Sequence, residues 1–155
     1  MPNYNFSQDH KIAMTTEKEI SEMLFEWYNW KTLKICDNNQ YDLLVQKKDK
    51  KLKIEIKEDF TCQKTGRVGL EFECRDKPSG ISTSQADYYL YKLHTRGVVR
   101  YFLISKKRLL GMIKNEKYHR IITGGDDGSN SKNYLFKFNV IRAHGKELFV
   151  KETRS

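Results

Sequence analysis

The stretch YDLLVQKKDKKLKIEIKED, residues 41–59, decides the fold. Two apolar runs of strand length flank a short turn that is rich in lysine. We therefore predict two antiparallel strands, over residues 41–47 and 52–59, joined by a two-residue turn at 48–49.

The hydrophobic pattern of these two strands also predicts their register. With that turn, one face carries three apolar pairs: Tyr41 with Ile56, Leu43 with Ile54, and Val45 with Leu52. The same register places Asp42 directly opposite Glu55 on the other face, with Lys57 two residues further along.

Two interpretations of this charged face remain open. Carboxylates directly opposed on a sheet repel each other, and a bound divalent cation such as Mg²⁺ would relieve the repulsion between Asp42 and Glu55. The alternative is an ordinary solvated hairpin, because a Lys-x-Glu-x-Lys pattern is common on the wet face of a strand.

The segments around the hairpin predict an α/β fold with a central mixed β-sheet flanked by helices. Before it, Thr15 or Thr16 can cap a helix, and an apolar stripe follows at helical spacing: Ile20, Met23, Leu24 and Trp27. A short strand is expected over 32–36, and a third strand, adjacent to the hairpin, over 68–74. Ser84-x-x-Asp87 resembles a capping box, so we predict a second helix from Ser84 to before Gly97.

The rest of the chain is expected to complete a single domain over residues 1–155. A buried-type strand is predicted over 98–104 and a short helix or turn over 106–117. After a loop at 124–133, a C-terminal β-hairpin is expected over about residues 134–151.

Charge and composition narrow the class of partner. Lys and Arg number 29 against 20 Asp and Glu, a formal net charge of +9, which favours polyanionic partners. Three widely spaced cysteines and four scattered histidines match neither a disulfide framework nor a zinc motif. Because neither a signal peptide nor a membrane-length apolar run occurs, we expect a cytoplasmic protein without a membrane partner.

Asp42, followed by Glu55-Ile56-Lys57 on the next strand, resembles the PD-(D/E)xK nuclease superfamily, and most closely its small Holliday-junction-resolvase-like members. The resemblance covers about residues 15–105 in the order of elements, with Tyr41 in place of the proline of the motif. It implies a restriction-endonuclease-like domain and an Mg²⁺-dependent deoxyribonuclease, with Mn²⁺ as a substitute metal.

The resemblance also implies roles for individual residues. Asp42, Glu55 and the Ile56 carbonyl would bind the metal, and Lys57 would assist the attacking water. A glutamate from the first helix would join them, for which Glu17 is the first choice and the alternatives are Glu19, Glu22 and Glu26. Gln85, with Tyr89 four residues on, matches a Gln-x-x-x-Tyr pattern that orients water or substrate. Glu71 and Glu73 are further candidates, with a solvated strand face as the alternative.

The expected partners are DNA and a second copy of the chain. Phosphate contacts are expected from basic residues at these positions: 47, 48, 50, 51, 53, 75, 77 and 106–108. Small nucleases of this type pair their active sites, so the resemblance implies a homodimeric endonuclease. The alternatives are a catalytically inactive nucleic-acid-binding protein on the same fold, and membrane-surface or protein binding through the basic face.

Overall fold

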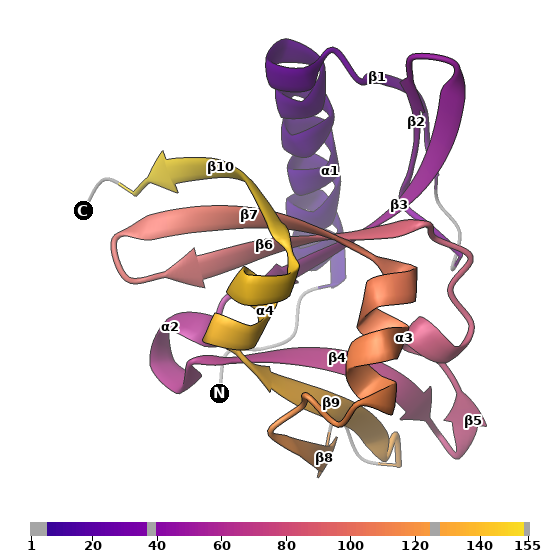
Figure 1. The fold of residues 1–155 in the computed structure, drawn as a ribbon, viewed down its shortest axis with the longest axis vertical. Coiled ribbons are helices and arrows are strands. Elements are labelled where there is room, and N and C mark those ends of the chain that lie inside the picture. Colours follow the sequence, from indigo (N-terminus) through magenta and orange to yellow (C-terminus); the bar gives the residue numbers. More distant parts are fainter. Residues whose placement is uncertain (1–5, 37–39, 125–127, 154–155) are drawn as a thin grey trace.

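The computed structural model describes residues 6–36, 40–124 and 128–153, and Figure 1 shows their arrangement. The helices are α1 (Phe6–Tyr28), α2 (Cys62–Thr65), α3 (Lys106–Lys114) and α4 (Phe138–His144), with a 3-10 turn, η1 (Gly80–Ser82). The strands are β1 (Lys31–Ile35), β2 (Leu43–Lys47), β3 (Lys50–Asp59), β4 (Arg67–Cys74), β5 (Lys77–Pro78), β6 (Tyr88–Thr95), β7 (Val98–Ser105), β8 (Arg120–Gly124), β9 (Ser131–Lys137) and β10 (Lys146–Glu152).

A six-stranded mixed sheet forms the centre of the molecule, with the order β1-β2-β3-β6-β7-β10. Strands β3 and β6 run parallel, whereas every other neighbouring pair in this sheet is antiparallel. Helices flank the sheet (Figure 1). The prediction of an α/β fold with a central mixed sheet is therefore confirmed.

The hairpin between β2 and β3 has the predicted turn and register. Leu43 pairs with Ile54, Val45 with Leu52, and residues 48–49 form the turn. Lys48 adopts a left-handed backbone conformation there, with φ of 55°. The ladder ends at the Leu43–Ile54 pair, so the predicted pair of Tyr41 with Ile56 is not part of it.

Helix α1 packs on one face of the six-stranded sheet. Ile20 and Leu24 are fully buried and share a cluster with Leu43, Val45 and Ile54. The helix ends at Tyr28, and β1 follows within one residue of its predicted bounds.

Two details of the predicted first helix are wrong. Thr16 does not cap its start, because α1 begins at Phe6 and the Thr16 hydroxyl donates instead to the Glu58 carboxylate. Trp27 does not belong to the buried stripe, since it is 70% exposed and lines a surface groove between α1 and the edge strand β10.

The predicted second helix, from Ser84 to before Gly97, is wrong: this segment is a loop followed by strand β6. The strand lies in the interior of the sheet, between β3 and β7. Both of its faces are covered, since Tyr89 and Tyr91 are buried on one side and Leu90 on the other. A strand buried on both faces lacks alternation of polar and apolar residues, which is why the spacing of its aromatic residues resembled a helix.

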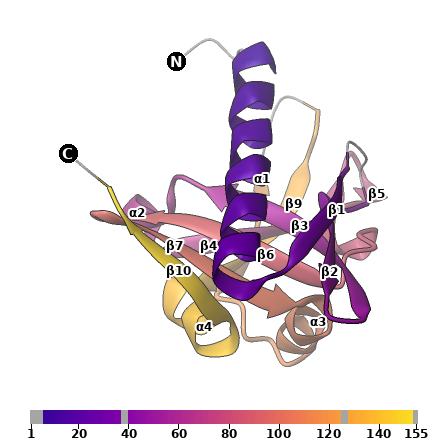
Figure 2. The same ribbon diagram turned by 90° about the horizontal axis from the view of Figure 1, so that it is seen from above.

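A second sheet, with the order β5-β4-β9-β8, covers the opposite face of the six-stranded sheet from α1 (Figures 1 and 2). The core between the sheets includes Tyr89 and Phe102 from the first and Leu70 and Phe136 from the second. Helices α3 and α4 close this core with Leu109, Met112 and Ile141.

This second sheet corrects two further predictions. Strand β4 exists near its predicted bounds, but it pairs with β5 and β9 instead of lying beside the hairpin. The C-terminal β-hairpin over about 134–151 does not form, because β9 and β10 belong to different sheets and α4 separates them. Pairing between β4 and β9 joins segments about 60 residues apart, which no local pattern specifies.

Candidate metal centre

Asp42 lies at the end of the hairpin, immediately before β2. Its backbone N–H donates to the Ile54 carbonyl at 2.9 Å, and its Oδ2 atom accepts from the Ile56 N–H at 2.6 Å. These two bonds hold the carboxylate against β3 beyond the end of the ladder. Burial raises the pKa of Asp42, although the Ile56 N–H and the Lys57 ammonium act in the opposite direction.

Glu55 and Lys57 lie on the same face of β3, which is the face that the second sheet partly covers. The Glu55 side chain is 16% exposed, and the Lys57 Nζ atom lies 3.5 Å from its Oε1 atom. Burial and then the nearby Asp42 carboxylate raise the pKa of Glu55, while Lys57 lowers it. The structure thus brings together Asp42, Glu55 and Lys57, as the hairpin register predicted.

Two buried tyrosines from β6 complete the surroundings of the acidic pair. Tyr89 and Tyr91 pair with Glu55 and Lys57 in the parallel ladder. Their hydroxyls have no hydrogen-bond partner within 3.5 Å among the described residues. Burial raises the pKa of Tyr89 to about 12; the Ser84 hydroxyl lowers it, and the Glu55 and Asp42 carboxylates raise it. The Gln-x-x-x-Tyr pattern pointed to Tyr89 but placed it on a predicted helix, and no motif pointed to Tyr91. With β6 as a strand, alternation puts both residues on the Glu55 face.

The oxygen donors here match the preferences of a hard cation. In a strand, the N–H and C=O of one residue point to the same side, so the Ile56 carbonyl is directed toward the side from which Asp42 contacts its N–H. Two carboxylates and a carbonyl form a ligand set that suits Mg²⁺, which commonly keeps several waters. Neighbouring carboxylates with raised pKa values also gain from a divalent cation.

The predicted third carboxylate, Glu17, does not complete this centre. Helix α1 packs on the opposite face of the six-stranded sheet from Glu55. Among the side chains that the structure describes, in residues 15–36, 40–124 and 128–153, no group of three His, Cys, Asp or Glu is arranged to hold a metal. Of the alternative glutamates on α1, Glu19 forms an ion pair with Lys92 on the α1 face of the sheet. Glu22 and Glu26 line a surface groove beside Trp27.

The other predicted site residues lie outside the acidic pair. Gln85 is exposed and not helical, although its backbone N–H donates to the Gln40 carbonyl, two residues before Asp42. Glu71 accepts from the hydroxyls of Ser79 and Ser131, and Glu73 pairs with Lys132. These glutamates therefore have partners within the second sheet.

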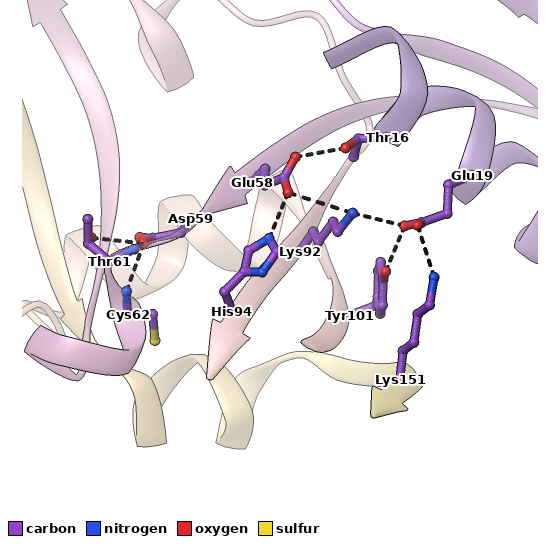
Figure 3. A network of polar contacts seen from close by, with 10 residues as sticks. All are labelled: Thr16, Glu19, Glu58, Asp59, Thr61, Cys62, Lys92, His94, Tyr101 and Lys151. Atoms are coloured by element: carbon purple, nitrogen blue, oxygen red, sulfur yellow. Dashed lines mark hydrogen bonds and ion pairs between the residues drawn. The ribbon is translucent and has the colours of Figure 1, made fainter. Parts of the chain in front are cut away.

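A second polar cluster lies on the α1 face of the six-stranded sheet (Figure 3). Lys92, with a side chain only 11% exposed, lies 3.0 Å from Glu19 and 3.6 Å from Glu58. Glu58 also contacts His94 and Thr16 at 2.7 Å each, and Glu19 also accepts from Tyr101 at 2.6 Å and from Lys151 at 3.4 Å. Both carboxylates thus have several donors, which is typical of a structural network that fixes α1 to β6 and β7. The sequence contained a signal only in the alternation of β3, which puts Glu58 on the face opposite Glu55 and Lys57.

A scan of protein-family models, a search of curated proteins and a search of solved structures each found no match to this chain.

Within the described part of the chain, no helix combines the length and the apolar character needed to cross a membrane.

Proposed function

We propose that this protein is a metal-dependent endonuclease that hydrolyses phosphodiester bonds of DNA, including branched or structured DNA. The observation that carries the proposal is the half-buried pair of Asp42 and Glu55 with Lys57 beside it. Burying two adjacent carboxylates opposes folding, so a site that keeps them indicates a bound cation or a catalytic use.

In this proposal, Asp42, Glu55 and the Ile56 carbonyl hold Mg²⁺, and Mn²⁺ can replace it. The bound metal supplies a more acidic water and neutralises charge on the phosphate. Lys57, which is 40% exposed in its side chain, reaches the surface beside Glu55, where it can orient the attacking water and contact the scissile phosphate. Tyr89 offers a hydroxyl donor on the same face.

The net charge of +9 supports a polyanionic substrate. Such a substrate also agrees with a cytoplasmic location, where the protein would have access to DNA. We further propose a homodimer, because cutting both strands of a duplex requires two active sites; light scattering coupled to gel filtration tests this point.

The second candidate is a nucleic-acid-binding protein that keeps this fold without catalysis. The absence of a third metal-binding carboxylate beside Asp42 and Glu55, among the described residues, favours it. The intact Glu55–Lys57 pair argues against it, because binding alone gives no reason to bury Asp42 and Glu55 side by side.

One cleavage experiment separates the two candidates. Labelled four-way junction, plain duplex, single-stranded DNA and RNA are incubated with the protein in Mg²⁺ or in EDTA. We expect Mg²⁺-dependent cleavage of DNA that Glu55→Ala and Lys57→Ala each reduce by at least about 100-fold. Matched controls remove the same charges from exposed positions elsewhere: Glu152→Ala on β10 and Lys34→Ala on β1. Binding without cleavage of any substrate would support the inactive alternative, and equal cleavage by the site variants would overturn the assignment of the site.

A further inference from the structure

The outer face of the four-stranded sheet carries a groove of about 570 Å³. Strands β4, β8 and β9 form its floor, and the segment that joins β3 to α2 lies at its end. Its lining residues are Asp59, Thr61, Thr65, Arg67, Gly69, His119, Arg120, Ile122, Asn133 and Leu135. The volume lies within the range of ordinary ligand sites.

Positive charge is concentrated along this groove. Arg67 on β4 and Lys137 on β9 are direct cross-strand partners, and Arg120 on β8 is the partner of Leu135, two residues before Lys137. Like charges placed opposite each other destabilise a sheet. Among the described residues, none of these three cations forms an ion pair with an acidic side chain. A bound anion would offset their repulsion.

His119 lines the groove next to Arg120. Its backbone N–H donates to the Leu135 carbonyl at 2.7 Å. Desolvation, followed by the charges of Arg67, Lys137 and Arg120, lowers the pKa of His119. The three cations therefore act together on one position of the surface.

Asp59, the carboxylate that lines the groove, forms no ion pair with these cations among the described residues. Asp59 Oδ1 accepts hydrogen bonds from the Thr61 N–H at 2.7 Å, the Thr61 hydroxyl at 2.9 Å and the Cys62 N–H at 2.9 Å (Figure 3). This carboxylate is thus used to shape the turn into α2.

Gly69 leaves the floor of the groove open at the centre of β4. A Cβ atom there would lie 3.5 Å from the Asn133 side chain and 3.9 Å from that of Leu135, which are ordinary contacts. Its φ angle does not lie in the left-handed region. Neither packing nor backbone conformation therefore requires glycine, whereas close approach of a ligand to the strand would.

We propose that this groove binds the phosphate groups of a nucleic-acid strand, as a contact region separate from the Asp42–Glu55 pair. Arg67 and Arg120 in the groove, with Lys137 opposite Arg67, supply the charge. The Asn133 amide supplies a hydrogen-bonding group, and Leu135 and Ile122 face the sugars. The proposal concerns binding alone, so it holds whether or not the protein cleaves DNA.

The test is the affinity of the full chain for fluorescent single-stranded and duplex DNA, measured by anisotropy in EDTA at several salt concentrations. Arg67→Gln/Arg120→Gln removes two charges from the groove. Gly69→Val fills its floor without changing charge, and it places a β-branched residue where a strand accepts one. The matched control, Lys31→Gln/Lys34→Gln, removes two exposed charges from β1, in the other sheet. Thermal unfolding of each variant checks that it is folded.

We expect Arg67→Gln/Arg120→Gln to weaken DNA binding at least tenfold at low salt. It should also reduce the slope of log affinity against log salt by about 1.4 to 1.8, which corresponds to two lost phosphate contacts. Gly69→Val should weaken binding with a smaller change in slope than Arg67→Gln/Arg120→Gln, because it removes no charge. The affinity of the Lys31→Gln/Lys34→Gln control should stay within about twofold of wild type. Equal losses in the groove variant and the control would overturn the proposal. Equal affinity for poly-glutamate of matched length would also overturn it, because the groove would then recognise charge without phosphate.

Discussion

The Asp42 carboxylate accepts a hydrogen bond of 2.6 Å from the Ile56 N–H. Asp42 lies one residue, and Ile56 two residues, beyond the Leu43–Ile54 pair that ends the β2–β3 ladder. The Asp42 side chain thus takes the place of a β2 backbone carbonyl as the acceptor for the Ile56 N–H of β3. This substitution directs the Asp42 carboxylate to the face of β3 that carries Glu55, and it leaves both groups partly desolvated. The end of the hairpin ladder therefore positions the candidate centre.

Mg²⁺ should stabilise the folded protein through this centre. A ligand that binds only the native state adds about 2.7 kcal/mol at 100 times its dissociation constant. For a chain of this size that corresponds to a rise of roughly 5–10 °C in Tm. We expect this rise in wild type but not in Asp42→Asn or Glu55→Gln, with Glu73→Gln as the matched control in the second sheet. An undiminished shift in Glu55→Gln, measured by calorimetry at constant ionic strength, would place the metal elsewhere.

The pH dependence of stability should carry a signature of the same carboxylates. The folded-state pKa of Glu55 is raised above its ordinary value of 4.5, so the native state binds more protons than the unfolded state above that pH. Its contribution to stability is therefore fully present below pH 4.5 and is lost as the pH rises through the folded pKa.

Denaturant unfolding of metal-free protein from pH 4 to pH 7 checks this sign. Glu55→Gln removes the titrating group, so it should gain stability relative to wild type as the pH rises. Glu73→Gln, which removes the charge of a glutamate paired with Lys132 in the second sheet, is the matched control. A constant difference between wild type and Glu55→Gln would mean that the Glu55 pKa is not raised.

The local parts of the fold could be predicted from the sequence. The hairpin register followed from the alternation of Leu43 and Val45 against Ile54 and Leu52, since one face had to be buried. Because Asp42 and Glu55 belong to that same register, the acidic pair could be predicted as well.

The non-local parts could not be predicted, for two physical reasons. Strand β6 is covered on both faces, so its sequence has no period of two, and Tyr89 and Tyr91 were assigned to a helix. The second sheet depends on pairing between β4 and β9, and the partner of a strand is not encoded in its own pattern. The basic groove, which combines Arg67 with Arg120, exists only once that pairing is known.

The cluster on the α1 face should depend on its buried lysine more than on its exposed one. Lys92 and Lys151 both contact Glu19, but their side chains are 11% and 60% exposed. Removing one partner from a buried ion pair costs about 3–5 kcal/mol, whereas exposed pairs contribute about 0–1 kcal/mol. Lys92→Met should therefore lower the free energy of unfolding by about 3 kcal/mol in urea titrations, and Lys151→Met by less than about 1 kcal/mol. Similar losses in both variants would show that burial does not govern this cluster.

Two buried tyrosines on opposite faces of the six-stranded sheet should respond oppositely to loss of the hydroxyl. Tyr101 donates to the Glu19 carboxylate at 2.6 Å, whereas the Tyr91 hydroxyl has no hydrogen-bond partner among the described residues. A hydrogen bond to a charged group contributes about 1.5–3 kcal/mol, and an unsatisfied buried hydroxyl costs about 1–3 kcal/mol. Tyr101→Phe should therefore destabilise the protein by about 2 kcal/mol, and Tyr91→Phe should stabilise it by about 1 kcal/mol. Because both variants remove one oxygen from a fully buried ring, each controls for the other, and equal destabilisation in urea unfolding would indicate that Tyr91 is hydrogen-bonded through a water molecule.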